Sequence, residues 1–345
     1  ETSKLISLTE QIAKQSQIRG SDSSGFCYKL DEKSTLKVIK APLSVKDFLD
    51  SNNYKQYKSE LLGELNLNSS KNIFTAIGHA RLVTNGSQLD FNNNQPVVKD
   101  DVVCVHNGII VNEHSLWSEY SDINKQFDID TEIICSLYRK FLKQSDNSID
   151  SIKKIANILL GTFSIGLLID DRNELIIYTN NGSLYTLSNQ KDLFIFASEK
   201  NILRNLIKKN KKLFDKSFKI SRISAHKGCL LDLENFIIND INKKNKNHNY
   251  KSKSIKYKID CIYNNSNNDQ LDMVIDLERK NKSINYNFEN NLLQNNSDQI
   301  NNLKRCSRCI LPETFPFISF DIDDVCNYCK NYKNKNYYRP LSVLN

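Results

Sequence analysis

The chain has 345 residues, of which 39% are hydrophobic, so it has room for two domains and enough apolar residues for a core. Its net charge of +8 arises in a Lys- and Asn-rich sequence, and we interpret it as solvated surface charge that disfavours a nucleic-acid-binding protein. Nine cysteines without a signal peptide argue against a disulfide framework. The longest apolar run, Ile155 to Ile169, is too short and too polar to span a membrane, so we expect a cytoplasmic protein without membrane contact.

The first predicted element is a helix with an apolar stripe at helical spacing, formed by Leu5, Leu8 and Ile12. It leads into a tight turn between Gly20 and Gly25, and a strand follows from Phe26. Asp22 lies in this turn, and the sequence leaves open whether it is only a turn residue or part of a site. Residues 44–70 are polar and helical in part, and we assign them no chemistry.

The most informative stretch consists of two apolar strands that each end in a polar turn with glycine, at Gly78–Gly86 and at Val102–Ile110. Strand ends of this kind build a polar pocket on a rigid sheet. Arg81 can clamp a carboxylate through two parallel hydrogen bonds. The Asn107 amide and the Gly108 backbone N–H can point together at a developing oxyanion.

Asp130 opens a predicted amphipathic helix that runs through Ile133 and Phe141, either as its N-cap or as a group of the pocket. A second helix spans about 149–160. Further strands and one more helix follow, at 163–169, 174–178, 183–187, 194–197, 203–213 (the helix) and 228–231. This order of strands, helices and strands fits an α+β fold with two antiparallel sheets between helical layers.

After Asn235 the composition changes, because Asn, Lys and Ser dominate and glycine disappears. We predict a polar linker or insertion at 236–304, with one short strand possible where apolar residues alternate between Ile255 and Tyr263.

Residues 305–345 contain two Cys-x2-Cys pairs separated by sixteen residues: Cys306, Cys309, Cys326 and Cys329. This spacing predicts a structural zinc site with four thiolate ligands. An alternative function is a zinc knuckle that binds RNA. Basic residues flank the first pair, but acidic residues lie beside the second, and this mixture disfavours RNA binding. The five other cysteines lie in apolar segments, and we interpret them as small buried residues.

Four motifs resemble, in order, those of class II glutamine amidotransferase domains, the N-terminal-nucleophile glutaminases of glucosamine-6-phosphate synthase and its relatives: Arg19–Gly25, Gly78–Gly86, His106–Ile110 and Asp130–Glu132. The resemblance covers residues 1–235 and implies a four-layer αββα sandwich. It implies that Arg81 holds the α-carboxylate of L-glutamine, with Thr84 lining the site. It further implies that Asp130 holds the α-amine, while Asn107 and Gly108 stabilise the oxyanion.

The same resemblance implies a cysteine nucleophile as the first residue of the mature chain. The sequence begins at Glu1 and offers no candidate. We therefore expect that its first strand and nucleophile are missing, and that this stretch alone lacks glutaminase activity.

Residues 306–329 resemble the opening of N-acetyl sugar amidotransferases of surface-polysaccharide synthesis. That resemblance implies a truncated synthetase domain that would use ATP and Mg beyond Asn345, with a sugar as acceptor. A glucosamine-6-phosphate-synthase-like or asparagine-synthetase-like amidotransferase is the alternative.

Overall fold

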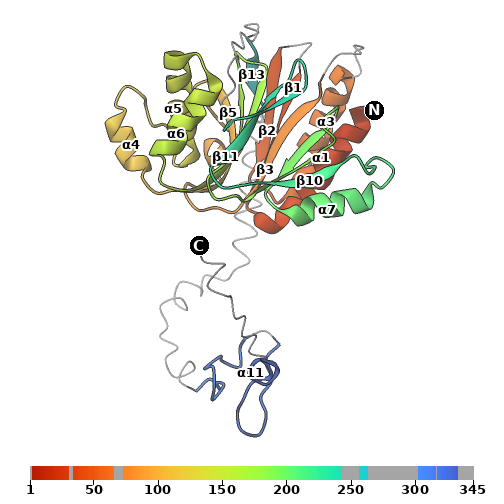
Figure 1. The fold of residues 1–345 in the computed structure, drawn as a ribbon, viewed down its shortest axis with the longest axis vertical. Coiled ribbons are helices and arrows are strands. Elements are labelled where there is room, and N and C mark those ends of the chain that lie inside the picture. Colours follow the sequence, from red (N-terminus) through yellow and green to blue (C-terminus); the bar gives the residue numbers. More distant parts are fainter. Residues whose placement is uncertain are drawn as a thin grey trace, which may run out of the picture. The chain divides into compact units, whose positions relative to one another are not determined.

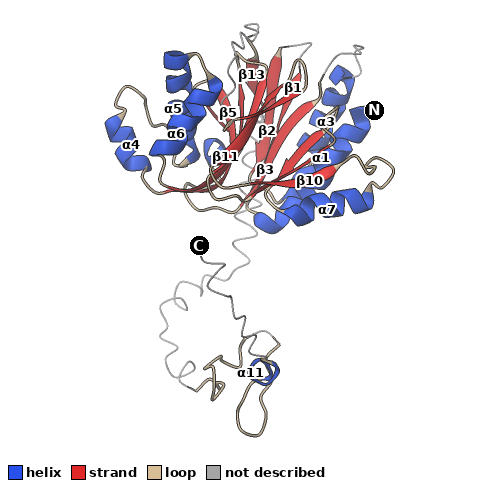
Figure 2. Ribbon diagram, in the orientation of Figure 1, coloured by secondary structure: helices blue, strands red, loops and turns tan. Residues whose placement is uncertain are grey.

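The structure, a computed structural model, describes residues 2–30, 34–65, 73–242, 256–262, 302–315 and 317–332. The chain separates into two compact units, Glu1–Gln270 and Leu271–Asn345, and each is described by itself. In the first unit, two sheets lie face to face between two groups of helices (Figures 1 and 2). Among the described residues, none of the helices combines the length and the apolar character that a bilayer span requires.

The helices of the first unit are α1 (Thr2–Ser16), α2 (Val45–Asp50), α3 (Asn52–Leu65), α4 (Glu113–Glu119), α5 (Thr131–Ser145), α6 (Ser148–Ile158) and α7 (Lys200–Lys209), with short 3-10 turns at Gln17–Arg19 and Phe91–Asn93. Its strands are β1 (Ser23–Leu30), β2 (Thr35–Ala41), β3 (Thr75–Arg81), β4 (Val97–Lys99), β5 (Val102–Ile110), β6 (Gly161–Ile169), β7 (Glu174–Thr179), β8 (Leu184–Ser188), β9 (Phe194–Ala197), β10 (Lys219–Ile223), β11 (Lys227–Asp232), β12 (Ile237–Asp240) and β13 (Lys258–Cys261).

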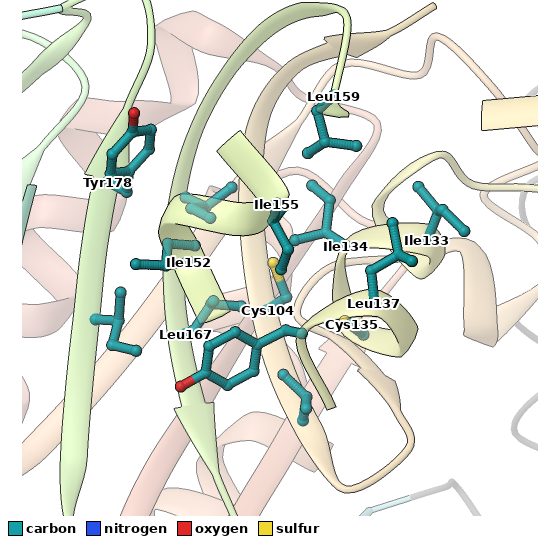
Figure 3. Packing of buried hydrophobic residues seen from close by; sticks show 14 of the residues in the cluster. Cys104, Ile133, Ile134, Cys135, Leu137, Ile152, Ile155, Leu159, Leu167 and Tyr178 are labelled. Atoms are coloured by element: carbon teal, nitrogen blue, oxygen red, sulfur yellow. The ribbon is translucent and has the colours of Figure 1, made fainter. Parts of the chain in front are cut away.

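The larger sheet has six antiparallel strands in the order β12-β11-β7-β6-β5-β4. Alternate residues of each strand point to opposite faces, so Cys104 packs toward the helices while Val103 and Val105 face the second sheet. Figure 3 shows α5 and α6 packed on this outer face, with Ile133 and Ile152 fully buried there. Both helices therefore form one covering layer.

The second sheet has the order β13-β2-β1-β3, and α1, α2 and α3 pack on its outer face around buried aromatic rings. Its inner face contributes Cys27, Val38 and Ile77 to the core between the two sheets. A three-stranded sheet, β10-β8-β9, packs against α7 and α1. The packing confirms the predicted α+β fold with two sheets between helical layers.

The structure departs from the sequence prediction after residue 235. Strand β12 pairs with β11, and β13 pairs in parallel with β2, although both lie within the predicted linker. The first unit therefore continues beyond the predicted domain boundary. The strand expected between Ile255 and Tyr263 is confirmed as β13, whereas β10 and α4 were not predicted. Helix α7 begins at Lys200 rather than at residue 203 and ends at Lys209, ahead of residue 213. Most of the predicted linker, 243–255 and 263–301, lies outside the described residues.

The second unit is described from 302 to 332, apart from residue 316. Two isolated β-bridges, Arg305 with Pro312 and Phe320 with Cys326, shape its loops. A short helix, α11 (Asn327–Asn331), follows, and the Cys326 side chain accepts a hydrogen bond from the Cys329 backbone at its N-terminus.

Candidate functional site

A cavity of about 780 Å³ lies in the first unit and is lined by residues of β3, β5 and β9. The five residues that the sequence predicts for a glutamine site all line it: Arg81, Thr84, Asn107, Gly108 and Asp130. Much of the remaining wall is apolar, with Ile77 from β3 and Phe196 from β9. Three segments far apart in the chain therefore bring their polar ends to one cavity.

Arg81 is the last residue of β3, and its side chain is buried. One terminal nitrogen of the guanidinium donates to Asn94 Oδ1 at 3.2 Å, and the other donates to the carbonyls of Asn85 and Gly86. Burial lowers the pKa of Arg81, and the nearby carboxylates of Asp130 and Asp22 oppose this shift. The guanidinium has five N–H donors, so the Nε–H and one N–H of the nitrogen that contacts Asn94 remain, and a bound carboxylate can accept from either of them.

Asp130 precedes α5, but its side chain does not cap that helix. Its Oδ2 accepts from the Ile110 backbone N–H at 2.8 Å, and its Oδ1 lies 3.7 Å from His106 Nδ1. Burial alone would raise the pKa of Asp130, but the contacts with His106 and the Ile110 N–H outweigh it and lower the pKa. The buried carboxylate therefore stays ionised and can hold a cation. Of the two readings that the sequence allows, the geometry favours a pocket group.

Asn107 and Gly108 lie near the end of β5, opposite Ser164 and Phe163 of β6. Gly108 has φ of +146°, and a Cβ at this position would lie 1.8 Å from the Thr162 carbonyl oxygen. Only glycine fits this close approach, which leaves its backbone beside the cavity unobstructed. Thr84 lies in the turn after β3, and Asp22 holds that turn by accepting from the Val83 N–H at 2.7 Å. Asp22 therefore supports the site from outside the cavity.

Several buried polar residues support the site and were missed by sequence reasoning. Gln95 Oε1 accepts from the His106 N–H at 2.6 Å, and Gln95 Nε2 donates to the His106 carbonyl at 2.9 Å. His79 lines the cavity, and burial together with His106 and Arg81 lowers its pKa to about 3, so it is neutral at pH 7. Lys40 donates to the carbonyls of Asn94 and Pro96 at 2.6 and 2.9 Å.

The buried Lys40 is expected to make the free energy of unfolding depend on pH. Burial lowers its pKa from 10.5 to about 7, so between these values the folded chain has lost a proton that the unfolded chain retains. The free energy of unfolding should therefore rise with pH across this window, by several kcal/mol in order of magnitude. Urea unfolding at pH 6.5, 8 and 9.5 should show wild type gaining stability relative to Lys40→Met. Lys37→Met, on the same strand and paired with Glu64, controls for the loss of a lysine stem. Parallel profiles for wild type and Lys40→Met would contradict the prediction.

No cysteine among the described residues lines the cavity. Cys27 and Cys104 are fully buried, and burial raises the pKa of each thiol. Cys229 is also buried, and its pKa is raised to about 12. These thiols stay protonated at neutral pH, as expected of small core residues.

The part of the chain that forms this site is similar to known proteins. Residues 79–205, which include all five predicted site residues, match the family model of the glutamine amidotransferase domain. The glutamine–fructose-6-phosphate aminotransferase (isomerizing) of Staphylococcus epidermidis is 30% identical over 135 residues, or 38% of this chain and 22% of that protein. This part of the chain is similar to glutamine amidotransferase domains.

One further curated relative and one solved structure are also similar to the chain. The enzyme of the same name from Thermococcus kodakarensis is 33% identical to the chain over 128 residues, which cover 36% of the chain and 21% of that protein. Among solved structures, the glutamine phosphoribosylpyrophosphate amidotransferase of B. subtilis, complexed with ADP and GMP, gives a TM-score of 0.48 at 19% identity, covering 69% of this chain and 47% of that one. The matched part of the chain spans only about a fifth of the length of each of these two curated relatives.

The second unit brings its four predicted ligands together. The sulfur atoms of Cys306, Cys309, Cys326 and Cys329 all lie within 4.8 Å of one another. The sulfur atoms of Cys309 and Cys326 lie 3.6 Å apart, and those of Cys306 and Cys329 lie 3.8 Å apart. Four thiolates at about 2.3 Å from one tetrahedral zinc would lie about 3.8 Å apart. Backbone N–H groups of Arg308 and Cys326 point at Cys306 Sγ, at 3.4 and 3.2 Å, which stabilises a thiolate. The donor set and its spacing fit a zinc ion.

Proposed function

We propose that the cavity binds L-glutamine and serves the ammonia-releasing half of an amidotransferase. The observation that carries this proposal is the meeting of Arg81, Asn107 and Asp130 at one cavity from three separate segments. A guanidinium and an ionised carboxylate complement the α-carboxylate and α-ammonium of an amino acid. Asn107 and Gly108 would then receive the side-chain amide. Thr84 would line the mouth.

Hydrolysis of glutamine at this site needs a nucleophile. In the proposed step a base takes the proton of a thiol, and the thiolate attacks the side-chain carbonyl carbon. The C–N bond then breaks, and the nitrogen leaves as ammonia after it receives that proton. Water then cleaves the thioester to give glutamate and regenerate the thiol. Two donors at the oxyanion would each stabilise the intermediate by roughly 3 kcal/mol.

The fold offers a place for a strand that carries such a thiol. Strand β3 is the edge of one sheet and β9 is the edge of another, and both line the cavity. A segment extended between them would join the two sheets and reach Arg81 and Asn107. We propose that the nucleophile arrives on such a segment.

For the acceptor, we propose an N-acetyl sugar of surface-polysaccharide synthesis, modified by an ATP- and Mg-dependent synthetase domain in the cytoplasm. The resemblance of residues 306–329 supports it. The curated relatives are named for fructose 6-phosphate, and a glucosamine-6-phosphate-synthase-like acceptor is therefore the first alternative, with an asparagine-synthetase-like acceptor the second. Incubation of the complete enzyme with glutamine, and with either N-acetyl sugar plus ATP or fructose 6-phosphate alone, separates the acceptors by the mass of the aminated product.

We also propose that the four cysteines hold one structural zinc ion. The zinc ion would stabilise the folded segment, which is too small to form a hydrophobic core. An RNA-binding knuckle is less well supported, because both lysines among the described residues 302–332 are paired with aspartates. Lys304 pairs with Asp324 at 2.5 Å and Lys330 pairs with Asp321 at 2.7 Å. A gel shift at low salt with single-stranded RNA should show no complex.

The glutamine proposal is tested by titration calorimetry with Asp130→Asn. The substitution removes the charge that would hold the α-ammonium, so the affinity for L-glutamine should fall by about 10- to 100-fold. 4-Carbamoylbutyrate, which is glutamine without its amine, should bind wild type and Asp130→Asn with the same affinity. Asp128→Asn is the matched control, since Asp128 is exposed nearby. Failure of the wild type to bind L-glutamine, or equal binding by Asp130→Asn, would count against the proposal.

A further inference from the structure

The Gln95 side chain takes the place of a missing strand residue beside the site. In the β4–β5 ladder Val97 pairs with Cys104, and each step back along β4 is matched by one step forward along β5. The position opposite Gln95 in this register is therefore His106. Backbone pairing in β4 begins at its first residue, Val97, so the backbone of Gln95 does not pair with His106.

The carboxamide of Gln95 continues the ladder where the backbone cannot. Its oxygen accepts from the His106 N–H at 2.6 Å, and its nitrogen donates to the His106 carbonyl at 2.9 Å. A side-chain amide thus makes both bonds that an opposing peptide group would make. Gln95 is 5% exposed and His106 is 2% exposed, so water does not replace these bonds.

The residue fixed in this way comes directly before the proposed oxyanion donors. Asn107 and Gly108 are held on their other side by β6, through Ser164 and Phe163. The neighbour of Gln95, Asn94, accepts from Arg81 at 3.2 Å. One loop therefore contacts both the strand that would receive the amide of glutamine and the guanidinium that would receive its carboxylate.

We propose that Gln95 is a positioning residue, whose carboxamide fixes the end of β5 so that Asn107 and Gly108 stand at the right distance from Arg81 for one glutamine molecule. This inference rests on the proposed glutamine site. Gln95 itself lines the cavity, and the role proposed for it acts through its two hydrogen bonds to the His106 backbone.

Two variants test the proposal by calorimetry with L-glutamine and by hydrogen exchange. Gln95→Leu removes both bonds, so we expect about 10-fold weaker binding and faster exchange in peptides covering 104–110. Gln95→Glu should behave like Gln95→Leu at pH 8, where a carboxylate faces the His106 carbonyl. At pH 5 the buried acid is protonated and can donate again, so both affinity and exchange should return toward wild type. Asp130 remains ionised at pH 5, because its pKa lies below its usual range.

Ile152→Ala controls for a general loss of stability, because Ile152 lies on the buried face of α6 and does not line the cavity. It should lower the unfolding temperature without weakening glutamine binding. If wild type binds glutamine and Gln95→Leu binds it equally well, the positioning role is refuted while the proposed function stands. If Gln95→Leu fails to fold, the proposal is tested by the glutamine affinity and hydrogen exchange of Gln95→Glu at pH 5 and pH 8. If neither quantity changes between these pH values, the proposal is overturned. If wild type does not bind glutamine, the proposed function fails, and the exchange rates still show whether Gln95 holds the end of β5.

Discussion

Replacing Arg81 with alanine is expected to weaken L-glutamine binding by about 100-fold, or roughly 3 kcal/mol. Two N–H groups of this buried guanidinium remain for a ligand after its bonds to Asn94, Asn85 and Gly86. A carboxylate that accepts from either would form a charge-assisted hydrogen bond, with which water competes poorly in this cavity. Arg81→Lys should recover only part of the affinity, since an ammonium keeps the charge but not the planar fork. Titration calorimetry on each variant measures the effect.

A glutamine analogue that lacks the α-carboxylate tests whether Arg81 binds that group. 4-Aminobutanamide is glutamine without its α-carboxylate, and it should bind wild type and Arg81→Ala with the same affinity. Arg139→Lys provides a destabilised control, because Arg139 is a buried arginine that pairs with Asp170 and Asp171 and does not line the cavity. Equal loss of affinity for both ligands in Arg81→Ala would indicate a collapsed site. Unchanged glutamine binding in that variant would remove Arg81 from the site.

The sequence predicted the layers well because their patterns are local. Alternation in β5 separates Cys104 from Val103 and Val105, and the helical stripe of α5 carries Ile133 and Phe141 to the same core. That the predicted site residues would line one cavity could also be expected, since Arg81 ends β3, Asn107 and Gly108 lie near the end of β5, and Asp130 precedes α5.

The supporting residues could not be predicted, because their roles depend on the register between strands. In the sequence, Gln95 is one of several consecutive polar residues in a loop, and its role emerges only when β4 is aligned with β5. Lys40 lies on a strand where a lysine is normally solvated, and it becomes buried only when the Asn94–Pro96 loop covers it. Strand β12 was missed for a related reason, since the Asn-rich composition around it resembles a linker, and only pairing with β11 orders it.

Removing zinc from the four-cysteine cluster is expected to unfold residues 302–332 while leaving the amidotransferase domain intact. The segment has few buried apolar side chains: Ile310, Phe317 and Ile322 are largely exposed, whereas Cys306 and Cys326 are buried. Apparent binding energies of structural zinc reach about 10 to 16 kcal/mol, far more than this segment can gain from packing. Purified chain should therefore contain one zinc per molecule, and Cys326→Ser should lose it. Proteolysis and hydrogen exchange should then rise within 302–332 only.

Cobalt distinguishes the proposed ligand set from adventitious metal. Cobalt bound by four thiolates in a tetrahedron gives intense charge-transfer and d–d absorption, and Cys309→Ser should weaken and shift these bands. Cys261→Ser is the matched control, because Cys261 lies in β13 outside the cluster and its loss should leave zinc content unchanged. Glutamine affinity should be the same with and without zinc, since no cluster residue lines the cavity. A chain that holds well below one zinc, or whose exchange within 302–332 ignores a chelator, would refute the metal site without touching the glutamine site.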